Sequence, residues 1–154
     1  MKKSVAIIAY SLLATAAFAG DQDDRQTLNL SEAQRGHVLK EMRALLSGTQ
    51  NILAALSKDD MAAVARHARP LGTNMAHKAE DHDHLKDVLP KEFMRLGMSL
   101  HQDFDQIASD AESKKDPKLT LRQLSDSMSK CTACHESYQI RKVTKSLDSG
   151  HRKH

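Results

Sequence analysis

Large aromatic side chains are scarce in this sequence. Its 154 residues include no tryptophan, three phenylalanines and two tyrosines. Tyr10 and Phe18 lie in an apolar N-terminal run, which leaves only Phe93, Phe104 and Tyr138 for the rest of the chain. Because aromatic rings normally supply much of the buried area of a core, this core must be built mainly from Leu, Ala, Met, Val and Ile.

Residues that interrupt helices are also few, with three prolines and six glycines. Alternation of apolar and polar residues is absent, and β-branched residues are sparse, so the pattern predicts helix throughout, with no strand and no internal repeat. Apolar residues at steps of three and four predict helices over about 31–56, from 59 or 60 to the high seventies, from about 90 to 111, and from 116 to beyond 141. We therefore expect an all-α fold, an antiparallel up-down four-helix bundle.

Local signals support these boundaries. Ser31 followed by Gln34 is a capping box at the start of the first helix. Pro70 predicts a kink or an early end in the second helix. The polar, His-rich residues 74–86 are interpreted mostly as a connection. Asp116 and Pro117 predict the cap and first position of the last helix, which carries Cys131, His135 and Tyr138 on one stripe.

The first residues have the layout of a secretory signal peptide. Lys2 and Lys3 precede an apolar run that ends in Ala17-Phe18-Ala19, a small-x-small cleavage pattern. We expect cleavage after Ala19 and a periplasmic protein. The alternative, an uncleaved anchor, is disfavoured because the run is shorter than the ~20 residues that a span needs. The expected divisions are a signal peptide (1–19), an N-terminal extension (20–30), a four-helix domain (31–143) and a basic disordered tail (144–154).

Charge excludes one class of partner. The chain has 23 Lys and Arg against 20 Asp and Glu, and removing Lys2 and Lys3 leaves 21 against 20. Nucleic-acid binding requires a clustered basic face, so we expect no nucleic-acid partner. After cleavage no segment is long and apolar enough to span a membrane.

The chemistry of the chain is concentrated in Cys131-Thr132-Ala133-Cys134-His135, the C-x-x-C-H haem attachment pattern. Two thiols three residues apart on a helix can meet the two vinyl groups of one porphyrin, and the following histidine can bind the iron. The porphyrin would also compensate for the missing aromatic residues.

The two cysteines have three other possible roles. A thiol-disulfide redox pair usually lies at a helix start in a βαβ context, whereas this motif lies late in a predicted helix of a chain with no predicted strands. A structural disulfide between neighbours so close would restrain little of the chain. A zinc site needs a fourth ligand and normally a second ligand pair. Haem attachment is the interpretation we favour.

A haem motif near the C-terminus, on the last helix of a four-helix bundle, resembles the class II c-type cytochromes, which comprise cytochrome c-prime and its low-spin, methionine-ligated relatives. The resemblance covers Ser31 to about Lys142 and rests on Cys131, Cys134 and His135, with Tyr138 three residues later. The family often has Arg directly after that aromatic residue. Gln139 stands there in this chain, and the nearest arginine is Arg141, so the chain departs from the family pattern at the position of that propionate contact.

The resemblance implies that a residue on the first helix faces the open side of the haem, and Met42 matches it by position. Methionine there implies a six-coordinate electron carrier with His135 as the proximal ligand. The alternative is that Leu39 or Leu46 covers an open iron face while Met42 only packs, which implies a five-coordinate haem that binds small gases such as NO and CO.

Other polar residues near these positions have ordinary explanations. His101 is a second candidate for the sixth ligand or a propionate partner, but a half-buried structural histidine is the default. His77, His82 and His84, with Asp81 and Asp83, could bind a surface metal, although a solvated loop is the simpler interpretation. Arg35 and Arg43 could reach a propionate, but arginines on a helix normally face solvent.

The sequence therefore predicts a periplasmic monohaem cytochrome that carries electrons and is not an enzyme. One haem c is held covalently by Cys131 and Cys134, and Leu39, Leu46, Met128 and Tyr138 help to bury it. The expected partners are redox proteins of the periplasm. Relatives in the family are often dimers through their first two helices, and both a homodimer and a monomer fit this chain.

Overall fold

The computed structural model describes residues 23–77 and 82–141, without the side chains of residues 82 and 83. The predicted signal peptide (1–19) and the whole of the predicted tail (144–154) lie outside these residues, as does Asp81. The described part is mostly helical with almost no strand, which confirms the predicted all-α class. None of its helices has both the length and the apolar character needed to cross a bilayer.

The first two predicted helices begin where their capping residues predict. Helix α1 spans Glu32–Leu56, and the Ser31 side chain and the Gln34 side chain each accept a hydrogen bond from the other's backbone N–H, which confirms the capping box. Helix α2 spans Met61–Ala68, and the Asp60 carboxylate accepts from the N–H of Ala63 at 2.8 Å.

Pro70 ends the regular part of the second helix, as predicted. The chain continues as a 3-10 turn, η1 (Arg69–Leu71), and then as the short helix α3 (Thr73–His77). Proline lacks the N–H that would continue the α-helical ladder, and its ring conflicts with the preceding turn. The interpretation of residues 74–86 as mainly a connection is wrong, because α4 (His82–Val88) follows α3 within this segment.

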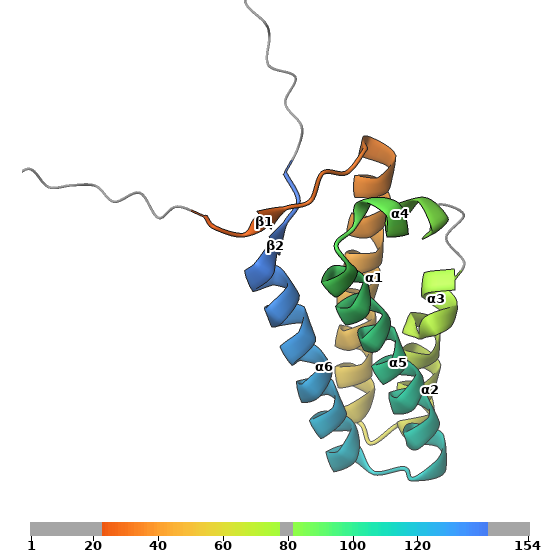
Figure 1. Ribbon diagram of the computed structural model, residues 1–154. Helices are drawn as coiled ribbons and strands as arrows, with labels where there is room; N and C mark the ends of the chain where they lie inside the picture. Colours follow the sequence, from red (N-terminus) through yellow and green to blue (C-terminus); the bar gives the residue numbers. More distant parts are fainter. Residues whose placement is uncertain (1–22, 78–81, 142–154) are drawn as a thin grey trace, which may run out of the picture.

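The last two helices are long and straight (Figure 1). Helix α5 spans Lys91–Ser113 after Pro90, and helix α6 spans Pro117–Ser137. The carboxylate of Asp116 accepts from the backbone N–H groups of Lys118 and Leu119, which confirms it as the cap of α6.

The predicted extension of the last helix beyond Arg141 is wrong, because α6 ends at Ser137 and Tyr138 is extended, with φ −129° and ψ 149°. Strand β2 (Tyr138–Gln139) pairs in parallel with strand β1 (Gln26–Thr27), and the N–H of Leu28 donates to Gln139 O at 2.9 Å. This long-range pairing replaces the helical hydrogen bonds, so the prediction that the chain has no strand is also wrong.

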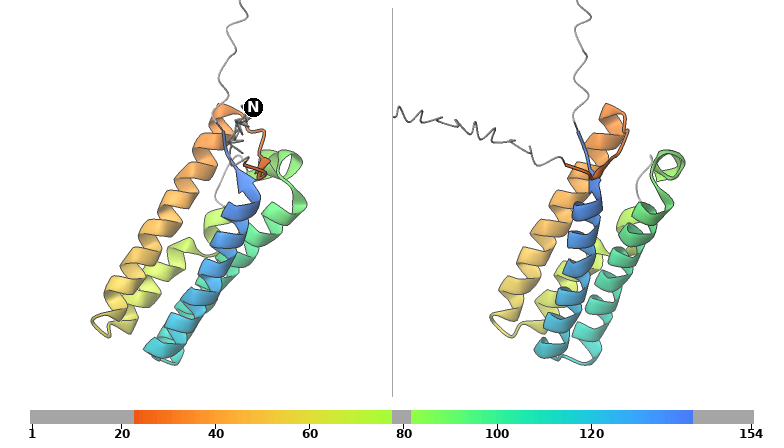
Figure 2. Two further views of the ribbon diagram at one scale, coloured as in Figure 1. Left: turned by 90° about the vertical axis from the view of Figure 1, so that its left-hand side faces the viewer. Right: turned by 60° about the vertical axis from the view of Figure 1, so that its left-hand side comes forward.

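Helices α1, α2, α5 and α6 lie side by side (Figures 1 and 2), with α2 packed on both α1 and α5, and α6 packed on α5. The main hydrophobic cluster is shared by these helices and includes the fully buried side chains of Ile52, Val64 and Ile107. Gly48 lets α1 approach η1 closely, since a Cβ atom there would collide with the end of the Leu71 side chain.

A second hydrophobic cluster lies near the start of α1 and the end of α6. Its buried members are Leu28, Leu30, Val38, Leu85 and Leu89. Met42 packs against this second cluster, whereas Cys131 packs against the main one. The candidate site described next is lined by residues of both clusters.

Candidate cofactor site

A cavity of about 440 Å³ lies among α1, α5 and α6, with further wall residues from α3, α4 and the turn after α4. This volume is within the range of pockets that hold small molecules and cofactors. Most wall residues are aliphatic or aromatic. The wall includes both of the sets predicted from the sequence: Leu39, Met42 and Leu46 from α1, and Met128, Cys131, Cys134 and His135 from α6.

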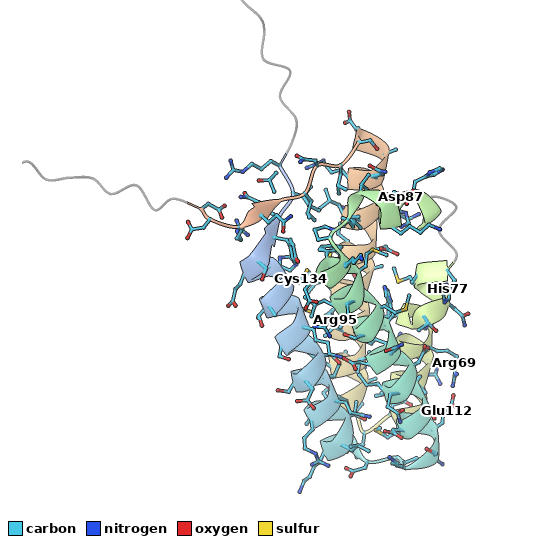
Figure 3. The ribbon with its side chains drawn as sticks, viewed as in Figure 1. Arg69, His77, Asp87, Arg95, Glu112 and Cys134 are labelled. Atoms are coloured by element: carbon cyan, nitrogen blue, oxygen red, sulfur yellow. The ribbon has the colours of Figure 1, made fainter. Side chains whose placement is uncertain are left out.

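The attachment motif occupies the cavity face of α6 near its C-terminal end. Cys131, Cys134 and His135 are three and four residues apart, a spacing that brings side chains to one side of a helix. Both cysteines are free thiols and half-buried, and Cys131 Sγ donates to the carbonyl oxygen of Ser127 at 3.6 Å. Figure 3 labels Cys134 on the side of α6 that faces α1 and α5.

Burial raises the pKa of both thiols above the ordinary value of 9.0. The negative charge of Asp103 adds to the rise at Cys131, and Cys131 adds to the rise at Cys134. Reactive redox thiols instead have a lowered pKa, from a helix N-terminus or a nearby cation. The environment near the C-terminal end of α6 therefore favours the protonated thiols.

His135 is exposed on the cavity wall, and its backbone is held from outside α6. Nη1 of Arg25 donates to its carbonyl oxygen at 3.1 Å. Tyr138, which was predicted to help bury a cofactor, is not among the residues that line the cavity. Its ring instead packs edge to face on Phe93, with centroids 5.4 Å apart, and Phe93 does line the cavity.

The α1 wall carries the predicted distal residues. Met42 and Leu39 are half-buried, and Leu46 is 72% exposed although it lines the cavity. Met128, on the α6 wall, is 53% exposed. Because Leu46 and Met128 line the wall and are also exposed, the cavity is open to solvent between α1 and α6.

His101 lines the same cavity from α5 and is only 6% exposed. Its Nδ1 lies 2.7 Å from the carbonyl oxygen of Leu71. Because a carbonyl only accepts, Nδ1 carries the proton in this contact, and Nε2 of the neutral ring keeps its lone pair. Metal-binding histidines commonly have this arrangement, but it equally satisfies a buried structural histidine.

Polar groups at the cavity form ion pairs that the sequence analysis did not predict. Lys130 Nζ lies 2.6 Å from Asp103 Oδ2 and donates to Ser99 O at 3.3 Å, which joins α6 to α5. His37 Nε2 and Glu41 Oε1 on α1 are 3.5 Å apart, a contact that is an ion pair only when the histidine is protonated. The i,i+4 spacing of His37 and Glu41 suggests their contact from the sequence. The contact of Lys130 with Asp103 joins two helices, so no local spacing predicts it.

The two arginines that were considered as propionate partners differ in position. Arg43 lines the cavity, whereas Arg35 does not. Arg35 Nε is buried and has no hydrogen-bond partner among the described residues. An unpaired buried donor is costly, so this N–H is suited to donating a hydrogen bond to a carboxylate.

The His-rich segment is described only in part, since Asp81 and the side chains of His82 and Asp83 lie outside the described residues. Within ranges 23–77 and 82–141, side chains of His, Cys, Asp and Glu form no group of three or more that could hold a metal ion. The simpler interpretation of this segment, a solvated loop, and its alternative, a surface metal at His77, His82 and His84, are both untested by these residues.

No protein-family model matches this chain, and no curated protein or solved structure is significantly similar to it. The function is therefore argued from the geometry of the cavity and the chemistry of its wall.

Proposed function

We propose that the chain is a monohaem c-type cytochrome that carries electrons. One observation carries the proposal: the two thiols and the histidine of the C-x-x-C-H motif line the same cavity as Met42. These residues come from helices at opposite ends of the described chain, and the motif alone does not require them to meet.

The wall is suited to a porphyrin. The cavity of about 440 Å³ is lined mostly by apolar side chains and opens to solvent. A large flat apolar group in it would remove these side chains from water, which is favourable in proportion to the apolar area buried. It would also supply the ring area that the aromatic-poor sequence lacks.

Each wall residue then has a role. Cys131 and Cys134 would hold the haem covalently, and His135 and Met42 would be the ligands of its iron. When bound, the haem iron supplies a one-electron couple between its ferric and ferrous states, and a methionine ligand raises its potential. The aliphatic wall, including Leu39, excludes water and lowers the local dielectric. Arg43 and Lys130 are cations on the wall, and Arg43 suits a propionate because Lys130 already pairs with Asp103.

The fold we propose is an antiparallel up-down four-helix bundle with the haem on its last helix. The side-by-side packing of α1, α2, α5 and α6 supports it (Figure 2). Bundles of this kind form cofactor sites from side chains on facing helices. The proposed location is the periplasm, and the basis for it is the signal-peptide pattern that ends at Ala19.

Cys131 and Cys134 lie late in α6 and away from a helix N-terminus, which disfavours a thiol-disulfide redox module, and the burial that raises the pKa of both thiols agrees with this. The remaining alternative is a five-coordinate, gas-binding haem. An absorption spectrum of the purified ferric protein separates it from the proposal. We expect a low-spin spectrum with the long-wavelength band of methionine-ligated haem. A high-spin spectrum, with rapid carbon monoxide binding after reduction, would contradict the electron carrier and support the gas-binding protein.

A further inference from the structure

The residues before α1 contact both halves of the cofactor site. Residues 23–30, which we call the N-terminal strap, cross the end of α6 just beyond the attachment motif (Figure 1). Arg25 Nη1 donates to His135 O at 3.1 Å, and Gln139 Nε2 donates to Arg25 O at 2.8 Å. Next along the chain, β1 pairs with β2, with Gln26 opposite Tyr138 and Thr27 opposite Gln139. The strap is therefore fixed to the end of α6 and to β2 at Arg25 and at the residues that follow it.

Arg25 is oriented by a second partner within the strap. Its Nε donates to Asp23 Oδ1 and its Nη2 to Asp23 Oδ2, both at 2.9 Å. A two-point contact of this kind fixes the guanidinium plane. The third nitrogen, Nη1, is then directed to His135 O, one of the helix-end carbonyls that lack a partner within the helix. His135 is exposed, and this hydrogen bond restrains its backbone from outside α6.

The other end of the strap supports Met42. Leu28 and Leu30 are 4% and 7% exposed and form a buried cluster with Val38. Met42, one turn after Val38 on α1, packs against this cluster, as does Tyr138. Removing a strap leucine would therefore loosen the packing around the Met42 side chain.

We propose that the N-terminal strap positions both axial ligands, with Arg25 acting through the backbone of His135 and Leu28 acting through the packing of Met42. The inference rests on the proposed function. Arg25 and Leu28 are positioning residues, because neither lines the cavity. Sites of this kind require their ligands to be held within about 0.5 Å of the productive geometry, so a loosened strap makes the methionine easier to displace.

The test measures how fast carbon monoxide displaces the distal ligand of the reduced holoprotein. Wild type is compared with Arg25→Ala, Arg25→Lys, Leu28→Ala and the control Arg69→Ala. Arg69 is an exposed arginine that pairs with Glu112 across η1 and α5 (Figure 3) and does not line the cavity. Haem content, ferric spin state and thermal midpoint are measured on the same samples.

We expect carbon monoxide to bind at least several-fold faster to Arg25→Ala and to Leu28→Ala, with a detectable high-spin ferric fraction. Arg25→Lys should recover part of the wild-type rate, and Arg69→Ala should match wild type even if its thermal midpoint falls. Wild-type rates and spectra in both Arg25→Ala and Leu28→Ala would overturn the inference while leaving the proposed function intact. A wild-type protein without haem, or without a distal ligand, would overturn the proposed function and the inference together.

Discussion

The Nδ1 atom of His101, a residue that lines the proposed haem cavity, lies 2.7 Å from the carbonyl oxygen of Leu71 in η1. This contact occupies one nitrogen of the ring and connects α5 to η1. It makes His101 either a structural residue with one unused nitrogen or a rival to Met42. The first two predictions separate these roles.

We predict that Met42→Ala converts the ferric haem from low spin to high spin. The midpoint potential should fall on the order of 0.1 V, a fraction of the ~0.8 V range that axial ligands control. Met98→Ala is the matched control, because Met98 lines the same cavity from α5. Absorption spectra and a redox titration check both variants. If Met42→Ala stays low-spin with an unchanged potential, Met42 is not the distal ligand.

We predict that His101→Leu leaves the low-spin spectrum intact but lowers the free energy of unfolding by about 1–3 kcal/mol. The reason is that the Leu71 carbonyl would lose its partner in a buried place. Denaturant unfolding and an absorption spectrum of the holoprotein provide the two readouts. Loss of the low-spin spectrum in His101→Leu, but not in Met42→Ala, would make His101 the distal ligand.

The strap should have an acid-sensitive ion pair. The side-chain hydrogen bonds from Arg25 lower the pKa of Asp23 from 3.8 to about 2. A lowered pKa means that the pair stabilises the fold above pH 3.8 and that this contribution disappears as the pH falls toward about 2. An NMR titration should place the Asp23 midpoint near 2 in wild type and closer to 3.8 in Arg25→Ala. Equal midpoints in the two proteins would show that the pair does not form in solution.

A backbone feature predicts a stabilising substitution. Lys115, after the end of α5, has a φ of 52°, and its N–H donates to Asp110 O at 3.2 Å. Glycine adopts this left-handed conformation without the Cβ penalty. Lys115→Gly should raise the free energy of unfolding by about 0.5–1 kcal/mol, whereas Lys118→Gly, inside the first turn of α6, should lower it. Thermal or denaturant unfolding measures both, and a loss of stability in Lys115→Gly would refute the prediction.

We predict that the chain packs poorly without its cofactor. In Cys131→Ala with Cys134→Ala, the 440 Å³ cavity has no covalently held group to fill it, and an apolar void reduces stability. Thermal unfolding of this double variant should be broad and shifted to lower temperature. A sharp transition at the wild-type temperature would contradict this.

Short-range signals account for most of what the sequence predicted correctly. The capping box at Ser31, the break at Pro70 and the cap at Asp116 are each local, because a side chain bonds to a backbone group a few residues away. Apolar spacing likewise predicted the long helices. The same spacing placed Met42 and Cys131 on the apolar stripes of two helices. The family resemblance then implied that they share one site.

The features that the sequence could not predict depend on contacts between distant residues. Tyr138 continues the apolar stripe of the last helix, yet it leaves the helix because β2 pairs with β1. Arg25 and Asp103 gain their partners His135 and Lys130 only when the chain is folded. Nothing in the local pattern around Arg25 distinguishes it from a solvated arginine in an acidic segment.

The central claim is that Cys131 and Cys134 hold one haem, and the most direct test is the intact mass of the protein from cells competent for haem attachment. Wild type should exceed its chain mass after signal cleavage by one haem, retained after denaturation. Cys131→Ala with Cys134→Ala should show the chain mass alone. A wild-type mass equal to that of the bare chain would contradict the account.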